Sequence, residues 1–290
     1  MEHRIEWLTL SLMLGAYLLW AVLLWAGIGW WAVVPLGILI AFQSSLQHEA
    51  LHGHPFASAR LNTALAFVSL IVVVPYTRFR DTHLAHHNDA QLTDPYDDPE
   101  TNFLDPDVWA RLPCIAQGLL VINNTLIGRL SVGPLIGTAM FLHGEWQQRT
   151  PDIVRQWAVH LIAVAIVAGA VWISPTAGSQ YVVAIYIGTA ILKLRTFLEH
   201  QAAARASARS VVVERGGGFG FLFLNNNLHV VHHMHPKVPW YALPRLYADN
   251  RAHYQRRNGG YVYRSYWAVM RAYGVRCKDP VCHPLWPRGE

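Results

Sequence analysis

The sequence predicts an all-α integral membrane protein: four transmembrane helices in two hairpins, one or two re-entrant or interfacial helices, and a cytosolic cap. Three observations predict it. Of the 290 residues, 53% are hydrophobic and 14% charged, whereas soluble proteins average about 25% charged residues. The uncharged residues gather in two long runs. Histidines gather in the polar segments that follow apolar runs, so the cap is expected to carry the polar site.

The first apolar run extends from Trp7 to Gln47 without a charged residue. A helix needs about 20 apolar residues to span roughly 30 Å of hydrocarbon. The run therefore predicts two crossings, about residues 7–26 and 30–47, joined by a tight turn at Gly27 and Gly29. Tryptophans flank this turn, as is typical of a membrane interface. The second crossing leads directly into His48.

The second long run, residues 156–192, predicts another hairpin. Its crossings are expected at about 156–173 and 180–194, with Ser174–Gly178 as the turn. The apolar stretch 61–77 is too short to cross and ends near Pro75, so a re-entrant segment is expected there. Residues 112–144 form shorter apolar pieces that are expected at the interface. Residues 48–155 and 195–290 are then the cytosolic segments.

The basic residues predict the orientation. Neither predicted hairpin turn contains Lys or Arg, and the basic residues fall in the segments on the other side. By the positive-inside rule that side is cytoplasmic, with both termini, and the membrane is expected to be the cell inner membrane. The net charge of +5 is accounted for by these loops, so no nucleic-acid partner is expected.

Three groups of histidines have helical spacing. Residues at i, i+3 and i+4 share one face of a helix, and neutral imidazole is the commonest metal ligand among side chains. Three such faces brought together would hold more than one metal ion. Box 1 is His48 and His52; box 2 is His83, His86 and His87; box 3 is His229, His232 and His233.

Box 1 alone has a second interpretation. His48-Glu-Ala-Leu-His52 matches the pattern of zinc proteases, in which Glu49 would be the general base. That site needs one further ligand and leaves boxes 2 and 3 unexplained. A membrane metal-binding or sensing protein without catalysis is another alternative.

The three boxes, in this order and separated by hydrophobic hairpins, resemble the membrane fatty acid desaturase and hydroxylase superfamily, which includes alkane monooxygenases and carotenoid ketolases. The resemblance covers nearly the whole chain, as a single domain over 1–290. It implies a non-haem di-iron centre with O2 as co-substrate, and a ninth ligand upstream of box 3, for which His200 is suited. The implied metal ligands are His48, His52, His83, His86, His87, His200, His229, His232 and His233.

One position departs from the family pattern. Relatives that act on acyl-CoA carry an Asn one turn before the additional histidine, where this chain has Thr196. A water-bridged Asn ligand is therefore not expected.

A shell made only of imidazoles leaves the irons cationic, so surrounding carboxylates are needed to orient the ring N–H groups and balance charge. The candidate carboxylates are Asp94, Asp97, Asp98, Glu100, Glu145 and Glu199. Other polar residues expected to support the boxes from outside are Asn226, Asn227, His54 and His235.

The resemblance implies O2-dependent desaturation or hydroxylation of an unactivated C–H bond in a fatty acyl or similar lipid chain, and the motifs do not decide between the two. Hydroxylation or ketolation of a carotenoid or another small hydrophobic molecule stays open.

Electrons are expected from an external protein, since no flavin, haem or iron–sulfur motif is visible. The candidate donors are a ferredoxin, a rubredoxin or a cytochrome b5 type protein with its reductase. Basic C-terminal residues would either steer such a donor or reflect the positive-inside bias. They are Arg245, Arg251, Arg256, Arg257 and Arg264.

Overall fold

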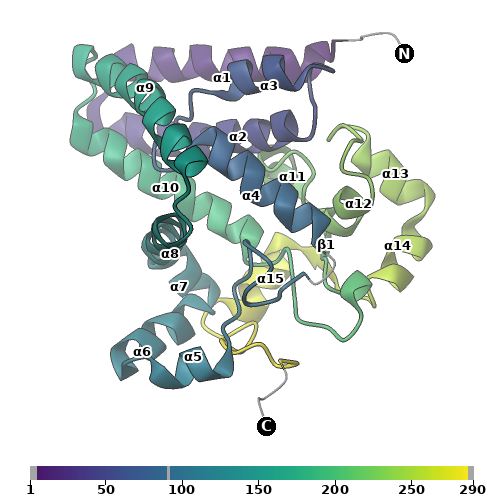
Figure 1. Ribbon diagram of the computed structural model, residues 1–290. Helices are drawn as coiled ribbons and strands as arrows, with labels where there is room; N and C mark the ends of the chain where they lie inside the picture. The colour runs from purple at the N-terminus through teal and green to yellow at the C-terminus, as the bar shows by residue number, and fades with distance from the viewer. Residues whose placement is uncertain (1–4, 90–91, 287–290) are drawn as a thin grey trace. The chain divides into compact units, whose positions relative to one another are not determined.

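The structure is a computed structural model that describes residues 5–89 and 92–286. It is mainly helical, as predicted (Figure 1). The chain divides into two compact units. Unit 1 comprises the residues up to Asp81 together with Pro134–Leu192; unit 2 comprises Thr82–Gly133 and the residues from Lys193 onward. Each unit is described separately below.

Unit 1 contains the long apolar helices. They are α1 (Trp7–Trp25), the 3-10 turn η1 (Gly29–Ala32), α2 (Val33–Leu51), α3 (Ala59–Ala66), the first residues of α4 (Tyr76–Asn88), most of α8 (Gly133–Gln147), α9 (Pro151–Ile173) and most of α10 (Gly178–Thr196). Among the described residues, Trp7–Trp25, Gly29–Leu51 and Pro151–Ile173 are long and apolar enough to cross a membrane. Three predicted crossings coincide with these segments. The fourth coincides with α10, whose last turn carries Lys193 and Arg195.

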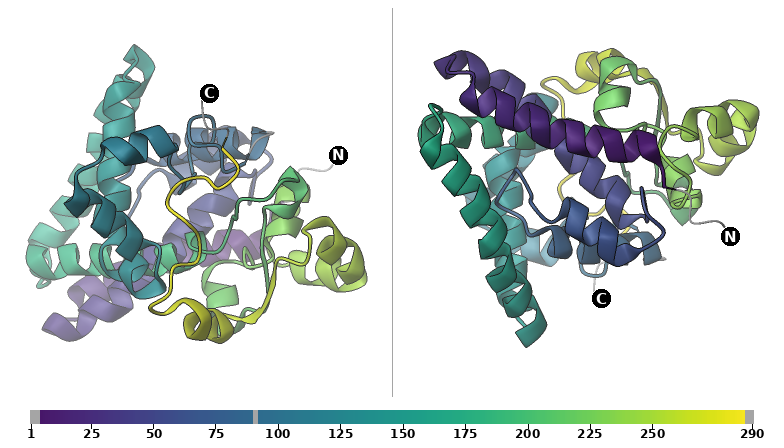
Figure 2. Two further views of the ribbon diagram at one scale, coloured as in Figure 1. Left: turned by 90° about the horizontal axis from the view of Figure 1, so that it is seen from below. Right: turned by 90° about the horizontal axis from the view of Figure 1, so that it is seen from above.

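The two predicted hairpin turns lie next to each other. Gly27 and Gly29 adopt φ values of 64° and 60° between α1 and η1, a region that glycine enters without steric cost. Thr176, between α9 and α10, donates a hydrogen bond from Oγ1 to the carbonyl of Leu24 at 2.9 Å. The ends of both hairpins therefore meet on one side of unit 1 (Figure 2, right).

Polar side chains within the apolar helices serve the irregular segment that follows α3. Backbone carbonyls that are buried away from water need hydrogen-bond donors. The carbonyls of Ala66, Val68, Leu70 and Val72 are met at 2.8 Å by Gln47, Tyr17, Tyr181 and His160, respectively. The stretch predicted as re-entrant therefore begins in helix α3 and continues as a non-helical segment, residues 67–75, whose carbonyls are held by donors on α1, α2, α9 and α10.

Close backbone contact joins α2 to α10. A Cβ built at Gly37 would lie 2.6 Å from Ile187, and one at Gly188 would lie 2.8 Å from Ile40. Both distances are below van der Waals contact, so only glycine fits at either position. Small residues that let helix backbones approach are typical of packing inside membranes.

Unit 2 contains short helices and one parallel strand pair. The elements are the last residues of α4, α5 (Pro106–Arg111), α6 (Cys114–Asn123), α7 (Leu126–Ser131), η2 (Ala206–Ala208), β1 (Val212–Arg215), α11 (Gly217–Leu222), α12 (His229–Met234), α13 (Leu243–Asp249), α14 (Arg251–Arg257), β2 (Val262–Ser265) and α15 (Tyr266–Tyr273). β1 pairs with β2 in the register Val212 to Val262. The apolar core beneath this pair includes Val230 and Val231 of α12.

The C-terminal segment holds the loop that follows α4. Leu104 forms a parallel bridge to Cys282 through backbone hydrogen bonds of 2.9 Å to Val281 and His283. The ring of His283 also lies 3.2 Å from the Thr93 hydroxyl. Residues 93–104 are therefore fixed at both ends, and this loop carries Asp98 and Glu100.

Unit 1 also contains a buried ion pair between α4 and α8, and substitution of one partner tests the packing of α8. Arg78 Nε and Nη2 donate to the Glu145 carboxylate at 2.8 and 2.9 Å, and Trp157 Nε1 donates to it at 2.9 Å. Removing one partner of a buried pair leaves an uncompensated charge. We therefore expect Glu145→Ala to lower the free energy of unfolding by about 3 kcal/mol. The measurement is the apparent melting temperature in detergent.

The matched control is Asp152→Ala, which breaks the exposed pair of Asp152 with Arg155 on α9. Exposed pairs contribute little, so no measurable change is expected. Equal melting temperatures for Glu145→Ala and the unsubstituted protein would contradict this description of the packing.

Candidate metal centre

Box 2 occupies the last turns of α4, as its spacing predicted, and two of its rings are fixed from outside. His86 Nδ1 lies 2.7 Å from Asp98 Oδ1, and His83 Nδ1 lies 2.7 Å from Glu100 Oε1. Asp98 accepts backbone N–H groups from Thr93 and Glu100 at 2.8 and 2.9 Å. Both carboxylates belong to the loop that the C-terminal segment holds, so the loop sets the orientation of the rings.

Box 3 forms α12, again as the spacing predicted, and a chain of polar groups fixes His229. His229 Nδ1 lies 3.0 Å from Asn226 Oδ1, and Asn226 Nδ2 donates to Glu199 Oε1 at 2.9 Å. Arg195 lies one turn before Glu199 and forms an ion pair with it at 3.0 Å. Because Asn226 gives its N–H group to Glu199, its oxygen faces His229, and Nδ1 of His229 must be the donor.

Four ring nitrogens converge between box 2 and box 3. His200 Nε2 lies 3.0 Å from Nε2 of both His86 and His229, and His229 Nε2 lies 3.1 Å from that of His233. The candidate ligand atoms of His86, His200, His229 and His233 all lie within 4.8 Å of one another. His200 was predicted only from the family pattern, and its ring lies in this group.

The spacing of these nitrogens fits coordination of one ion. Two nitrogens at about 2.1 Å from a first-row metal and at right angles to each other lie about 3.0 Å apart. The Nδ1–H groups of His86 and His229 face Asp98 and Asn226, so their Nε2 atoms point into the group, where a bound metal would take the place of a proton. Lone pairs this close repel one another unless a cation lies between them. The donor set therefore fits a transition-metal ion such as iron.

A second group in unit 2 combines the remaining rings of boxes 2 and 3. The candidate ligand atoms of His83, His87 and His232 also lie within 4.8 Å of one another. His232 Nε2 lies 3.0 Å from His87 Nε2, and the rings of His83 and His87 are 4.7 Å apart. Boxes 2 and 3 thus form two neighbouring sets of imidazoles within unit 2.

Box 1 belongs to unit 1. His48 lies in the last turn of α2, and His52 is the C-cap residue that follows it. Their ring centroids are 4.8 Å apart and both side chains are buried. The predicted helical spacing of box 1 is confirmed.

The electrostatics of unit 2 keep most of these imidazoles neutral. Burial, followed by the neighbouring charge of His86, lowers the pKa of His200 to about 3. Burial and the charge of His83 lower the pKa of His87 to about 3, and the pKa of His233 also falls well below its usual value through burial. A neutral imidazole is the form that binds a metal.

The outer carboxylates carry the compensating charge. Burial opposes ionisation of Glu100, but the charges of His83 and His86 hold its pKa well below the usual range. Burial also opposes ionisation of Asp98, but its hydrogen bond to His86, the charge of that ring and the backbone N–H groups of Thr93 and Glu100 together lower its pKa. Burial likewise acts against the charge on His86, yet Glu100 and Asp98 raise the pKa of its ring to about 9. Anions therefore surround a site that favours a cation.

Several other predicted residues have different contacts. Asp94 accepts backbone N–H groups from Tyr96 and Asp97, and Glu145 pairs with Arg78, as described above. Asn227 donates to the Val213 carbonyl at 2.7 Å. Two histidines predicted to support the boxes also have other partners. His54 Nδ1 lies 2.7 Å from Glu6 in unit 1, and the ring of His235 packs edge-on against Tyr254.

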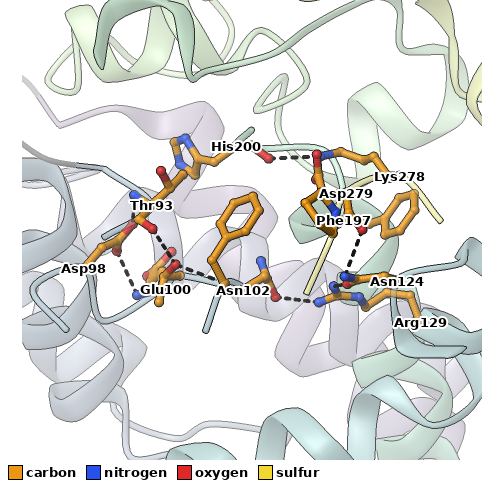
Figure 3. Close-up of a pocket in the computed structure, with 13 residues that line it drawn as sticks. Thr93, Asp98, Glu100, Asn102, Asn124, Arg129, Phe197, His200, Lys278 and Asp279 are labelled. Carbon is orange, nitrogen blue, oxygen red and sulfur yellow. Dashed lines mark hydrogen bonds and ion pairs between the residues drawn. The ribbon is translucent and has the colours of Figure 1, made fainter. Parts of the chain in front are cut away.

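A small polar cavity borders His200 on the side of the Asp98 and Glu100 loop (Figure 3). Its volume of about 20 Å³ is enough for a water molecule. Lys278 donates to the His200 backbone carbonyl at 3.1 Å, and Arg129 hydrogen-bonds the side chain of Asn124 at 3.1 Å.

Sequence reasoning did not assign roles to Arg195 or Lys278. The i, i+4 spacing of Arg195 and Glu199 was an available signal, whereas nothing local links Lys278 to His200.

Comparison with known proteins adds the family. A search of curated proteins found no match. The chain matches the family described as Fatty acid desaturase over residues 24–267. This range contains the three boxes and His200, and it covers most of the chain. The chain therefore belongs to the fatty acid desaturase family, whose members are oxidoreductases of membranes that act on lipids.

Proposed function

We propose that this protein uses O2 to desaturate or hydroxylate an unactivated C–H bond in a fatty acyl or similar lipid chain, at two irons held by nine histidines. The observation that carries the proposal is the convergence of four Nε2 atoms from His86, His200, His229 and His233. The group His83, His87 and His232 supports a second ion. His48 and His52 enter the ligand set from their helical spacing and from the family pattern.

The residues of unit 2 have definable tasks in this chemistry. When bound, the irons would supply O2 binding and an oxidant strong enough to remove hydrogen from an alkyl chain. Asp98, Glu100 and the pair Asn226–Glu199 fix which ring nitrogen carries the proton, so the other nitrogen is available to a metal. Burial of the rings limits the access of water to the site.

We also propose four crossings, with the boxes and both termini on the cytoplasmic side of the cell inner membrane. The adjacent hairpin turns support this orientation because neither contains Lys or Arg. In this arrangement α10 is the fourth crossing and Lys193 and Arg195 lie at its cytoplasmic end. Electrons would come from an external ferredoxin, rubredoxin or cytochrome b5 type protein.

Iron retention tests the role of Asp98. We expect Asp98→Asn to weaken iron binding by roughly 10- to 100-fold, because the ring of His86 loses its anionic acceptor. The measurement is a chelator titration of the iron-loaded protein. Asp94→Asn is the control: an amide oxygen can still accept from the backbone of Tyr96 and Asp97, so iron affinity should not change. Equal effects of the two substitutions would contradict the assignment.

Lipid analysis tests the reaction itself. Expression in a bacterial host should produce acyl chains with a new double bond or hydroxyl group, only in the presence of O2, and His229→Ala should abolish them. Mass spectrometry of total lipids is the measurement. Oxidised carotenoids without altered acyl chains would replace the proposed substrate by the alternative class. Peptide hydrolysis that is lost in Glu49→Gln would instead support a zinc protease.

A further inference from the structure

We propose that an acidic one-electron carrier protein docks on the outer face of α13 and α14, and that Tyr254 and His235 link this face to box 3. We name this surface the α13–α14 basic face and define it by Arg245, Arg251, Arg256 and Arg257. The inference rests on the proposed function, since it supplies the electrons that the oxidation consumes. It adds a location and a route within unit 2.

The helices that carry the α13–α14 basic face pack against α12 through their buried sides. Leu243 and Tyr247 of α13 and Tyr254 of α14 pack in one buried cluster with Val230 and Val231 of α12. The three helices are grouped together in Figure 1. A protein bound to the outside of α13 and α14 is therefore separated from box 3 by these two helices and by the cluster that packs them against α12.

The charge of the face is only partly compensated. Arg251 pairs with Glu214 at 2.6 Å, and Arg245 lies 3.8 Å from Asp249. In the described part of the chain, no carboxylate lies within ion-pair distance of Arg256 or Arg257, and both are exposed. Complementary charge steers encounter and fixes the register of weak complexes. The face is therefore suited to a partner with an acidic surface.

A chain of rings connects the face to the ligands. The exposed ring of His253 lies 5.5 Å from that of Tyr254, and the buried Tyr254 ring lies 6.2 Å from that of His235. The backbone N–H group of His235 donates to the backbone carbonyl of His232 at 3.1 Å. Electron tunnelling weakens steeply with distance and with empty space, so packed rings followed by a hydrogen bond form an efficient route.

The electron balance is simple. The reduced centre of the carrier loses one electron, and one ferric iron is reduced to ferrous iron. Two such transfers, with two protons from water, accompany each O2 that is consumed. An exposed basic surface would also attract anionic lipid. The donor is favoured here because the rings beneath this face lead to box 3, which lipid binding does not require.

Binding measurements test the docking. The probes are an acidic [2Fe–2S] ferredoxin and a rubredoxin, bound to the full chain in detergent at low salt. We expect Arg256→Glu with Arg257→Glu to weaken the binding of one of them by about tenfold or more. The control, Arg271→Glu with Arg276→Glu, reverses two exposed charges elsewhere in unit 2. This control should change the affinity for the carrier less than twofold. Equal effects of both pairs, or no saturable binding of either probe, would overturn the docking site.

Reduction kinetics test the route separately. At saturating carrier, His235→Ala should slow reduction of the bound iron several-fold without changing iron content or carrier affinity, and His235→Phe should restore the rate. If the rate of iron reduction were unchanged in His235→Ala, His235 would not be part of the route. Selective loss of anionic-vesicle binding in the Arg256 and Arg257 variant, with carrier affinity intact, would reassign the face to lipid.

A chemical reductant separates this inference from the proposed function. Dithionite reduces the iron without the carrier. After its removal and the addition of O2, the Arg256 and Arg257 variant should oxidise substrate normally in a single turnover, whereas turnover driven by the carrier should be slow. If the protein binds the carrier at this face but oxidises no lipid with either reductant, the docking site stands and the proposed function fails.

Discussion

The site depends on holding several neutral imidazoles close together in a buried place. Burial and the neighbouring charge of His86 lower the pKa of His200 to about 3, but burial does not choose which nitrogen carries the proton. That choice is made by oxygens of Asp98, Glu100 and Asn226, which accept hydrogen bonds from Nδ1–H groups. Without these hydrogen bonds, it would not be fixed whether the Nε2 atoms, which lie 3.0 to 3.1 Å apart, carry a proton or a lone pair.

The supporting structure explains how such crowding is tolerated. Carboxylates on the 93–104 loop bring negative charge next to box 2, and the C-terminal segment holds that loop through the Leu104–Cys282 bridge. In unit 1, polar side chains on the apolar helices satisfy the carbonyls of an irregular segment. In both units these buried polar groups have specific partners, because burying a polar group without a hydrogen bond is costly.

Local spacing predicted much of the fold and of the site. The i, i+3 and i+4 pattern placed boxes 2 and 3 on helices, and the uncharged runs located the long helices of unit 1. Contacts between distant residues left no such signal. Asn226 reaches Glu199 across 27 positions and Lys278 reaches His200 across 78. Short polar loops adopt conformations that tertiary contacts decide, so the different roles of Asp94 and Asp98 were not predictable.

The central claim is that the histidine groups hold two irons. The most direct test is the metal content per chain of protein purified in detergent, for the unsubstituted protein and for His232→Ala. The account predicts about two irons per chain, and a content that is halved or lost in His232→Ala. A single zinc ion that is unaffected by His232→Ala would contradict it.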